Sequence, residues 1–378
     1  METIKLFYQD SHLREFTATV LSCRQTEKGF LVTLDATTFY PEGGGQACDL
    51  GQLGDANVLD VREKEGQLLH LCDKALEVGK PVRGSIDWAR RFDLMQQHSG
   101  EHIVSGIVHR MFGWHNVGFH MGSGLMTIDF DGPIPAEALV DIENKANQAV
   151  WDNLPVRCWY PSEEELPTVT YRSKKALPWP VRIVEIPGTD NCACCGTHVK
   201  STGEIGLIKL VSCIKFHQGV RIEMACGRKA LALAQQVFEQ NRQVSQAFSA
   251  KMLETGAAAQ KMNEALAVQK LRANTLQSVL FDHIAAQFTG KGNVWHFADG
   301  LTPGQTRELA DKIAAVCGGW AAVLSGEEDD YSICIVSKAD DVKAIGAHLG
   351  ARGGGKPGFF QGSLRARRGQ IEALFAQL

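Results

Sequence analysis

Two histidines in the string MQQHSGEHIVSG, which begins at Met95, have a spacing that can serve a metal ion. His98 and His102 are four residues apart, so on a helix both imidazoles lie on one face, one turn apart. Glu101 directly precedes the second histidine and completes the pattern His-x-x-Glu-His, which is typical of inverted zinc metalloproteases. The string therefore predicts a zinc protease, another zinc hydrolase, or a helix with two unrelated histidines.

A second group of metal-binding residue types follows in the string CACCGTH, which begins at Cys192. Cys194 and His198 have the spacing Cys-x-x-x-His, and thiolate and imidazole ligands together suit Zn²⁺. A tetrahedral site of three histidines and one cysteine would consist of His98, His102, Cys194 and His198. Cys192 or Cys195 could take the place of Cys194, so the identity of the sulfur ligand stays open.

The two groups together fit the protease pattern poorly. A protease would use Glu101 as the general base and a distal glutamate as a ligand, which leaves the Cys-Thr-His cluster unexplained. Four protein ligands form a structural zinc site, whereas three ligands and an open position form a catalytic one. Hydrolysis of an activated ester needs only a polarised water, a nearby base and correct positioning, which such a site could supply.

A glycine-rich loop, TTFYPEGGGQ from Thr37 to Gln46, follows a predicted strand. Gly43, Gly44 and Gly45 permit positive φ angles and leave their N–H groups bare, so a ligand carbonyl or phosphate can approach closely. The loop lacks the Gly-Lys-Ser/Thr ending of a P-loop, and no long helix follows it as in a dinucleotide fold. The alternative is a wide hairpin turn, but the flanking threonines and aromatic pair favour a ligand-binding loop.

The composition of the 378 residues is that of a soluble globular protein, and the length predicts about two to four domains. The first residues lack an apolar core, and no apolar run approaches the roughly 18 residues of a membrane span, so we expect neither a signal peptide nor a membrane partner. Eleven cysteines without a secretion signal favour reduced thiols and a cytoplasmic location. The net charge of −4 leaves nucleic-acid binding to local patches.

The hydrophobic patterns predict a multidomain protein of the α+β class. Short β-branched runs separated by glycine and polar turns predict a small β-barrel in residues 1–89, with a sandwich as the alternative. Asp87 can cap a helix that carries the two histidines, and strands follow, so we expect an α+β domain in residues 90–229. Residues 230–290 contain no proline and predict a helical hairpin or a coiled-coil arm, interrupted near Gly256. Residues 291–378 begin with a predicted strand, helix and strand, and we expect a C-terminal α/β domain there.

The predicted arm has a repeating seam at alternating intervals of three and four residues. The seam consists of Ala259, Met262, Leu266, Gln269, Ala273, Leu276 and Leu280. Such a seam could pair two copies of the chain, so we expect a homodimer through the arm or the C-terminal domain. The alternative is that these helices pack on a neighbouring domain.

Basic side chains gather near the C-terminus, between Leu349 and Ile371, where no acidic residue occurs. The candidate RNA-binding residues are Arg352, Gly353, Gly354, Gly355, Lys356, Arg365, Arg367 and Arg368. Phe359 and Phe360 lie among them, and basic groups interleaved with aromatic rings can pair with phosphates and stack on bases. The alternative is a solvated basic end of a helix.

These strings together resemble a known family. TTFYPEGGGQ, QQHSGEHIVSG, GFHMGSGLMTIDFDG and CCGTHVKSTGEIGLIKLVSCIKFHQGVRIEMACGRKAL are similar to the editing domain shared by alanyl-tRNA synthetase and the freestanding AlaX proteins. The tail GARGGGKPGFFQGS resembles the glycine-rich motif of the DHHA1 domain of long AlaX proteins. The motifs occur in the same order over nearly the whole chain, and no stretch resembles the aminoacylation core of the synthetase.

The resemblance implies a trans-editing deacylase, an enzyme that hydrolyses tRNA(Ala) wrongly charged with serine or glycine. It implies Zn²⁺ as the cofactor, bound by His98, His102, Cys194 and His198. Thr37 would recognise the serine hydroxyl, and Gln97 and Glu101 would lie in the catalytic site. The aminoacyl pocket would be lined by Gly43, Gly44, Gly45, Gln46 and His120. The C-terminal domain would contact the tRNA.

Three positions depart from the family pattern. Glu101 is often Gln in relatives, Cys195 occupies a place often held by Gly, and Gly118 stands where Ser is common. These departures leave open the obligatory base, the sulfur ligand and the substrate contact of the Phe-His loop. A tRNA-binding protein with a structural zinc and no activity is the alternative function, and a zinc protease is a weaker one.

Overall fold

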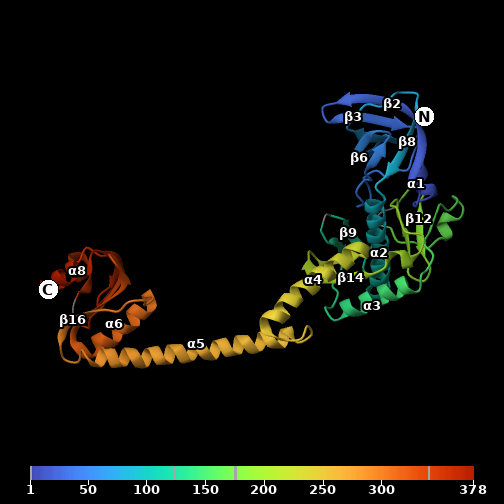
Figure 1. Cartoon of the computed structure of the whole chain (residues 1–378). Helices are drawn as coiled ribbons and strands as arrows, with labels where there is room; N and C mark the ends of the chain where they lie inside the picture. The colour runs from blue at the N-terminus through green and yellow to red at the C-terminus, as the bar shows by residue number, and fades with distance from the viewer. Residues whose placement is uncertain (1, 123, 174–176, 339–340) are drawn as a thin grey trace. The chain divides into compact units, whose positions relative to one another are not determined.

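The computed structural model describes residues 2–122, 124–173, 177–338 and 341–378 (Figure 1). Contacts within the chain group it into two compact units, residues 1–243 and 244–378. The finer division into four domains stays a prediction. No helix in these described ranges is both long and apolar enough to cross a membrane.

A closed barrel of six strands begins the first unit. Its strands, in spatial order, are β2 (Glu15–Thr26), β3 (Gly29–Leu34), β7 (Gln67–Cys72), β6 (Ala56–Lys64), β5 (Gly51–Leu53) and β8 (Pro81–Ile86). Buried and exposed residues alternate along the start of β2, which directs Phe16, Ala18 and Val20 into the barrel. A short parallel pair, β1 (Ile4–Lys5) and β4 (Ala36–Thr37), and the helix α1 (Leu6–Gln9) lie outside this set.

A long helix, α2 (Trp88–Phe112), leaves the barrel directly after β8 (Figure 1). The predicted cap is confirmed, because the Asp87 carboxylate accepts a hydrogen bond from the Arg90 N–H at 3.1 Å. Gly113 ends the helix with φ of 78°. Every residue from Leu94 to Val108 is buried, so this helix forms the centre of the α+β part of the unit.

Two sheets and one further helix surround α2. The four-stranded sheet has the order β14 (Ile208–Phe216), β15 (Gly219–Cys226), β10 (Met126–Phe130) and β9 (Asn116–His120). The three-stranded sheet has the order β11 (Arg157–Trp159), β12 (Ile183–Ile186) and β13 (Asp190–Ala193). Helix α3 (Ala138–Trp151) and the 3₁₀ turns η1 (Leu166–Thr168) and η2 (Thr202–Ile205) complete this part. Ile103, Ile128 and Ile222 belong to the core shared by α2 and the larger sheet.

The predicted helical arm consists of two helices, α4 (Gly227–Phe248) and α5 (Thr255–Ala286). The interruption falls at residues 249–254, before Gly256, which lies in the first turn of α5. Ser249 adopts φ of 48°, a conformation that does not continue a right-handed helix. The interruption predicted near Gly256 is therefore confirmed, although it begins at Ser249, which gives no comparable signal in the sequence.

The second unit contains a five-stranded sheet with helices on both faces. Its strands have the order β16 (Gly292–Phe297), β17 (Gly318–Glu327), β18 (Asp330–Val336), β20 (Phe359–Arg365) and β19 (Arg352–Lys356). One face packs on α5 and α6 (Pro303–Cys317), and the other packs on α7 (Val342–His348) and α8 (Arg368–Phe375). The parallel pair β16 and β17, joined by α6, is the strand-helix-strand unit that the sequence predicts.

Candidate metal centre

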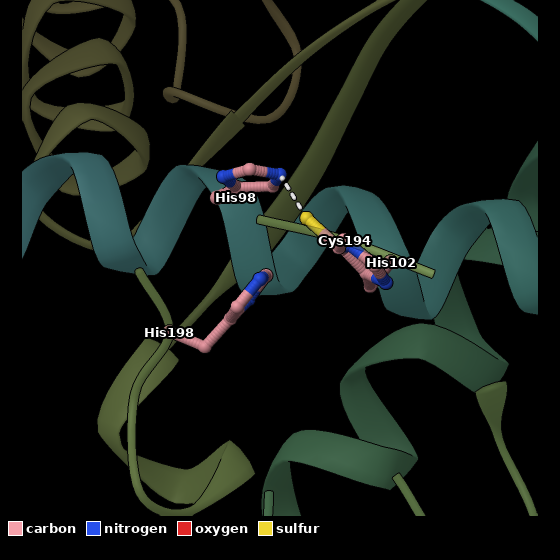
Figure 2. Close-up of side chains that lie close together, drawn as sticks. All are labelled: His98, His102, Cys194 and His198. Atoms are coloured by element: carbon pink, nitrogen blue, oxygen red, sulfur yellow. Dashed lines mark hydrogen bonds between the residues drawn. The ribbon is translucent and has the colours of Figure 1, made fainter. Parts of the chain in front are cut away.

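The four predicted metal ligands come together beside α2 (Figure 2). Their ligand atoms all lie within 4.8 Å of one another, and Cys194 Sγ is 3.3 Å from His98 Nε2. His98 and His102 project from one face of the helix, whereas Cys194 and His198 come from the segment that follows β13. Two motifs about a hundred residues apart in the sequence therefore form one cluster.

Each imidazole of the cluster is held through its Nδ1 atom. The partners are Gln46 Oε1 for His98 at 3.0 Å, Asp190 Oδ2 for His102 at 2.9 Å and Ser99 Oγ for His198 at 3.2 Å. An amide oxygen and a carboxylate can only accept, so the first two histidines donate from Nδ1, and in the neutral imidazole the lone pair then lies on Nε2. Outer partners of this kind are typical of histidines that bind metals.

The Nε2 atom of His198 tests whether a metal fits this cluster. It is buried and has no hydrogen-bond partner among the described residues. A buried polar atom without a partner costs free energy, which a cation at the centre of the cluster would recover. Three imidazole nitrogens and one sulfur are a donor set that suits tetrahedral Zn²⁺, so the residues fit that ion.

The electrostatics single out one of the three neighbouring thiols. Burial would raise the pKa of Cys194, but the surrounding histidines hold it well below its usual range. Burial raises the pKa of Cys192 to about 11 and also raises that of Cys195. Cys194 therefore carries the thiolate, which is the form that binds a metal.

Burial and the hydrogen-bond partners push two histidine pKa values in opposite directions. Burial lowers the pKa of His198 to about 3. For His102, burial acts in the same direction, but the hydrogen bonds to Asp190 and Cys194 and the negative charges of Cys194 and Glu101 together outweigh it and hold the pKa well above the usual value. Arg172 in turn binds Asp190 at 2.7 and 2.8 Å, so this carboxylate stays ionised behind the cluster.

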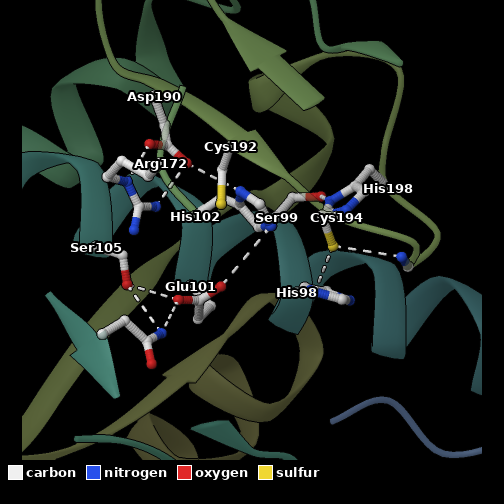
Figure 3. A network of polar contacts seen from close by, with 12 residues as sticks. His98, Ser99, Glu101, His102, Ser105, Arg172, Asp190, Cys192, Cys194 and His198 are labelled. Atoms are coloured by element: carbon white, nitrogen blue, oxygen red, sulfur yellow. Dashed lines mark hydrogen bonds and ion pairs between the residues drawn. The ribbon is translucent and has the colours of Figure 1, made fainter. Parts of the chain in front are cut away.

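Glu101 lies at the side of the cluster (Figure 3). Its Oε1 atom accepts hydrogen bonds from Ser105 Oγ, at 2.5 Å, and from Asn116 Nδ2. Its Oε2 atom is 3.9 Å from His102 Nε2. One oxygen is thus anchored, and the other faces the atom of His102 that would bind a metal.

Gln97, the other predicted catalytic residue on the helix, makes a different set of contacts. Its amide donates to the Cys226 carbonyl at 2.7 Å and accepts from the Cys226 N–H at 3.1 Å. Both ends of the side chain therefore bind the backbone at the end of β15, which is a structural contact between α2 and the sheet.

The glycine loop forms a tight turn, not the wide hairpin of the alternative prediction. Gly43 and Gln46 exchange two backbone hydrogen bonds, and Gly44 and Gly45 have φ of 59° and 83°, which glycine adopts readily. A Cβ atom on Gly45 would lie 2.6 Å from the ring of Phe119. The centroid of that ring is 5.2 Å from the His98 ring centroid, so the turn meets the cluster through Phe119.

Thr37 ends β4, and its hydroxyl is already bound to His70 of the barrel strand β7. His70 Nδ1 donates to the Val32 carbonyl at 3.2 Å, so the Thr37 hydroxyl donates to His70 Nε2 at 2.9 Å. The same hydroxyl accepts from the Phe39 N–H at 3.1 Å. The neighbouring Thr38 is equally buried, but its hydroxyl has no partner within the described ranges. Sequence reasoning missed Thr38, although it stands beside Thr37 in the same motif.

The residue of the Phe-His pair that reaches the cluster is Phe119. Phe119 is paired with Ile128, a core residue, whereas His120 is paired with Thr127 and is exposed. Successive residues of a strand point to opposite faces, so His120 lies on the face of the sheet away from α2.

Comparisons with known proteins match both halves of this arrangement. The family described as "Threonyl and Alanyl tRNA synthetase second additional domain" matches residues 181–223, which include Cys194 and His198. The family described as "tRNA synthetases class II (A)" matches residues 5–90, which include the glycine turn.

Individual relatives extend the match along the chain. The alanyl-tRNA editing protein Aarsd1 of Mus musculus is 37% identical over 54% of this chain and 54% of its own length. Aarsd1 of Danio rerio is 27% identical over 98% of this chain and 96% of its own. The alanine–tRNA ligase of Halorubrum lacusprofundi is 32% identical over 96% of this chain and 42% of its own. The chain belongs to the alanyl-tRNA editing protein family.

The chain spans about half the length of the mouse family member, at 54%. It is also homologous to the editing domain of alanine–tRNA ligases, and the Halorubrum enzyme matches it over 96% of this chain. The family assignment therefore covers both the segment with the metal cluster and the segment with the glycine turn.

The second unit divides the predicted RNA-binding residues between two faces of its sheet. Register places Arg352 opposite Ser363 and Lys356 opposite Phe359, so these side chains and Arg365 share one face. Phe359 packs with the core under α6, and the Arg307 guanidinium lies 4.6 Å from its ring centroid.

The other predicted basic residues lie at the start of α8, on the opposite face. The Arg368 guanidinium is 4.4 Å from the ring centroid of Phe297, which packs with the core under α7 and α8. Arg367 is the residue that precedes this helix. The sequence could not indicate the split, because it depends on strand register, and it could not associate Arg307 with the tail.

Proposed function

We propose that the protein is an aminoacyl-tRNA deacylase that hydrolyses Ser-tRNA(Ala), with Gly-tRNA(Ala) as a second substrate. The observation that carries the proposal is that three imidazoles and the Cys194 thiolate come together in a member of the alanyl-tRNA editing family. Each imidazole is also fixed by a hydrogen bond at its Nδ1 atom. The cofactor would be Zn²⁺. Because tRNA is charged in the cytoplasm, the proposed location is cytoplasmic.

His98, His102, Cys194 and His198 would hold the metal ion. When bound, Zn²⁺ supplies Lewis-acid polarisation of the ester or positions the aminoacyl end. The buried ring nitrogen of His198 and the low pKa of Cys194 support this ligand set over one with Cys192 or Cys195. The set also lacks the distal glutamate of the inverted protease, which argues against a protease.

The chain's own groups would bind and orient the aminoacyl ester. The free oxygen of Glu101 lies near the metal-binding atom of His102, where it could accept a proton from the attacking water. The N–H groups of Gly44 and Gly45, which lie between the paired Gly43 and Gln46, would approach the aminoacyl carbonyl. Gln97, whose amide is bound to Cys226, would act only by fixing the helix.

Selection of serine requires a polar contact to its hydroxyl, because an apolar pocket separates serine from alanine only by about 10². Thr37 is the residue that the family motif predicts for this contact. Its hydroxyl hydrogen is taken by His70, so it could only accept from the serine hydroxyl. Thr38, whose buried hydroxyl has no partner in the described part of the chain, is the rival candidate.

The tRNA would bind the face of the second unit's sheet that carries Arg352, Lys356 and Arg365. Arg307 and Phe359 extend this face with a cation and an aromatic ring. The phosphates of the tRNA would attract these positively charged side chains, and the ring of Phe359 offers a stacking surface for an unpaired base.

The seam of α5 supports the proposed homodimer. Met262, Leu266, Leu276 and Leu280 are each at least half exposed on this helix. Exposed apolar residues in a repeat of three and four are typical of a coiled-coil interface. Light scattering on the full chain should give twice its 41.3 kDa, and a mass of one chain would refute the dimer.

The test of the function is release of amino acid from three charged tRNAs. We expect the protein to hydrolyse Ser-tRNA(Ala) fastest, Gly-tRNA(Ala) more slowly and Ala-tRNA(Ala) least. Binding of tRNA without release of any amino acid would support the alternative of an inactive RNA-binding protein with a structural zinc. Cleavage of a casein substrate would support the protease.

A further inference from the structure

Gln46 ends the glycine turn, where the family motif places it against the substrate, yet its side chain is occupied by protein contacts. Its Oε1 atom accepts from His98 Nδ1 at 3.0 Å and from the Thr197 N–H at 3.1 Å. Its Nε2 atom donates to Thr197 Oγ1 at 2.8 Å. Gln46 is 1% exposed and Thr197 is fully buried, so these contacts exclude water.

The contact with His98 decides which ring nitrogen can bind a metal. The amide oxygen of Gln46 cannot donate, so the proton of the neutral imidazole lies on Nδ1. The lone pair then lies on Nε2, the atom 3.3 Å from Cys194 Sγ. Gln46 thus accepts the Nδ1 hydrogen bond of His98 and fixes its ring, as Asp190 does for His102.

The contacts with Thr197 hold the segment that supplies the other two ligands. Thr197 directly precedes His198 and follows Gly196, whose backbone lies against the imidazole of His98. A Cβ atom on Gly196 would be 2.1 Å from His98 Cε1, so only glycine permits this approach. One amide therefore fixes a ligand on α2 and the segment between Cys194 and His198 at the same time.

We propose that Gln46 is a positioning residue of the metal centre, which couples metal binding to the order of the glycine turn. This inference rests on the proposed metal centre and goes beyond the lining role that the motif suggests. This coupling must be reciprocal. If the ordered turn stabilises the metal-binding geometry of His98, a bound metal must in turn stabilise the ordered turn.

The first measurement is the Zn²⁺ affinity of the full chain, determined by competition with a chromophoric chelator. Loss of an outer partner typically weakens metal binding about 10- to 100-fold, and we expect this loss for Gln46→Leu. Gln46→Glu should stay within tenfold of wild type, because a carboxylate can accept from both N–H donors. If Gln46→Leu does not fold, Gln46→Glu still tests the inference, because a loss of Zn²⁺ affinity larger than tenfold in that variant would contradict it.

Gln96→Leu is the matched control. Like Gln46, Gln96 is a buried glutamine, but it lies on α2. Its amide donates to the Glu204 carbonyl at 2.8 Å and accepts from the Arg228 N–H at 3.3 Å. The hydrogen bonds of its side chain go to backbone atoms of Glu204, Ile205 and Arg228 and not to a ligand, so its loss should lower stability and leave the zinc affinity unchanged.

The second measurement is amide hydrogen exchange in the glycine turn, at Gly43 and Gln46, with and without Zn²⁺. We expect zinc to slow exchange at both amides in the wild-type chain and to have little effect in Gln46→Leu. Unchanged zinc affinity and unchanged turn protection in Gln46→Leu would overturn the inference.

The two measurements also separate this inference from the proposed function. Zinc binding that depends on Gln46, in a protein that releases no serine, would refute the deacylase and leave the inference standing. A wild-type chain that binds no zinc would refute both.

Discussion

At the scale of single residues, the proposed metal centre depends on the side chains that hydrogen-bond to its ligands. Gln46, Ser99 and Asp190 hold one imidazole each by Nδ1 and leave Nε2 for the metal. The ligands themselves follow from residue types and spacing. Their partners do not, because Gln46 and Asp190 are far from their histidines in the sequence and no local pattern pairs them.

The threonine pair of the glycine loop gives a prediction at this scale. Thr38→Val should lower kcat/KM for Ser-tRNA(Ala) about tenfold, the worth of one hydrogen bond, and leave Gly-tRNA(Ala) nearly unchanged. Thr37→Val should mainly lower stability, by about 1–3 kcal/mol, because it leaves His70 Nε2 and the Phe39 N–H without their partner. Steady-state deacylation and thermal unfolding of both variants measure these effects.

The reverse result would restore the motif's assignment. A stable Thr37→Val protein that loses serine selectivity, beside an unaffected Thr38→Val protein, would show that Thr37 contacts the substrate.

At the scale of elements, α2 is tied to the barrel by a buried ion pair. The guanidinium of Arg91 binds the Asp49 carboxylate, and it also donates to the carbonyls of Thr38 and Ser11 at 2.6 and 2.9 Å. Both members of the pair are fully buried. The pair therefore fixes the position of the metal-binding helix against the segments on either side of the glycine turn.

Breaking one half of this pair should destabilise the first unit strongly. Asp49→Asn leaves a buried guanidinium without a counter-charge, which costs about 3–5 kcal/mol. Chemical denaturation of the full chain, followed through the first unit, measures the loss. The double variant Asp49→Leu/Arg91→Leu is the control and should lose less, since it leaves no buried charge; an equal or larger loss would contradict this account.

Helices and strands were predictable from the sequence where a local pattern, such as hydrophobic periodicity or a capping residue, determines them. The strand pattern of the barrel, the Asp87 cap and the strand-helix-strand unit of the second half all follow from periodicity and capping. The break between α4 and α5 lies near Gly256 as predicted, but the sequence does not indicate that it begins at Ser249. The orientation of His120 depends on the register of β9 against β10, which a single sequence does not reveal.

At the scale of the whole molecule, the proposed function divides between the two units. The first holds the four proposed metal ligands, and the second presents a basic sheet face made by Arg352, Lys356, Arg365 and Arg307. The family match over 98% of the chain and 96% of the zebrafish protein shows that both units occur together in a relative.

Charge reversal on the sheet face tests the role of the second unit. The triple variant Arg352→Glu/Lys356→Glu/Arg365→Glu should weaken tRNA binding more than tenfold at moderate salt. It should also reduce the slope of log K against log salt by about 2 to 3, because roughly 0.7–0.9 is lost for each phosphate contact. Arg367→Glu/Arg368→Glu, on the opposite face, is the matched control, and an equal loss in that control would refute the assignment of the face.

The most direct test of the central claim is the rate of serine release from Ser-tRNA(Ala) by the wild-type chain, by the chain after chelation and by Cys194→Ala. We expect rapid release by the wild type, and loss of it both after chelation and in Cys194→Ala, with activity restored to the chelated wild type by Zn²⁺. Release by Cys194→Ala at the wild-type rate would contradict a deacylase that works at this metal centre.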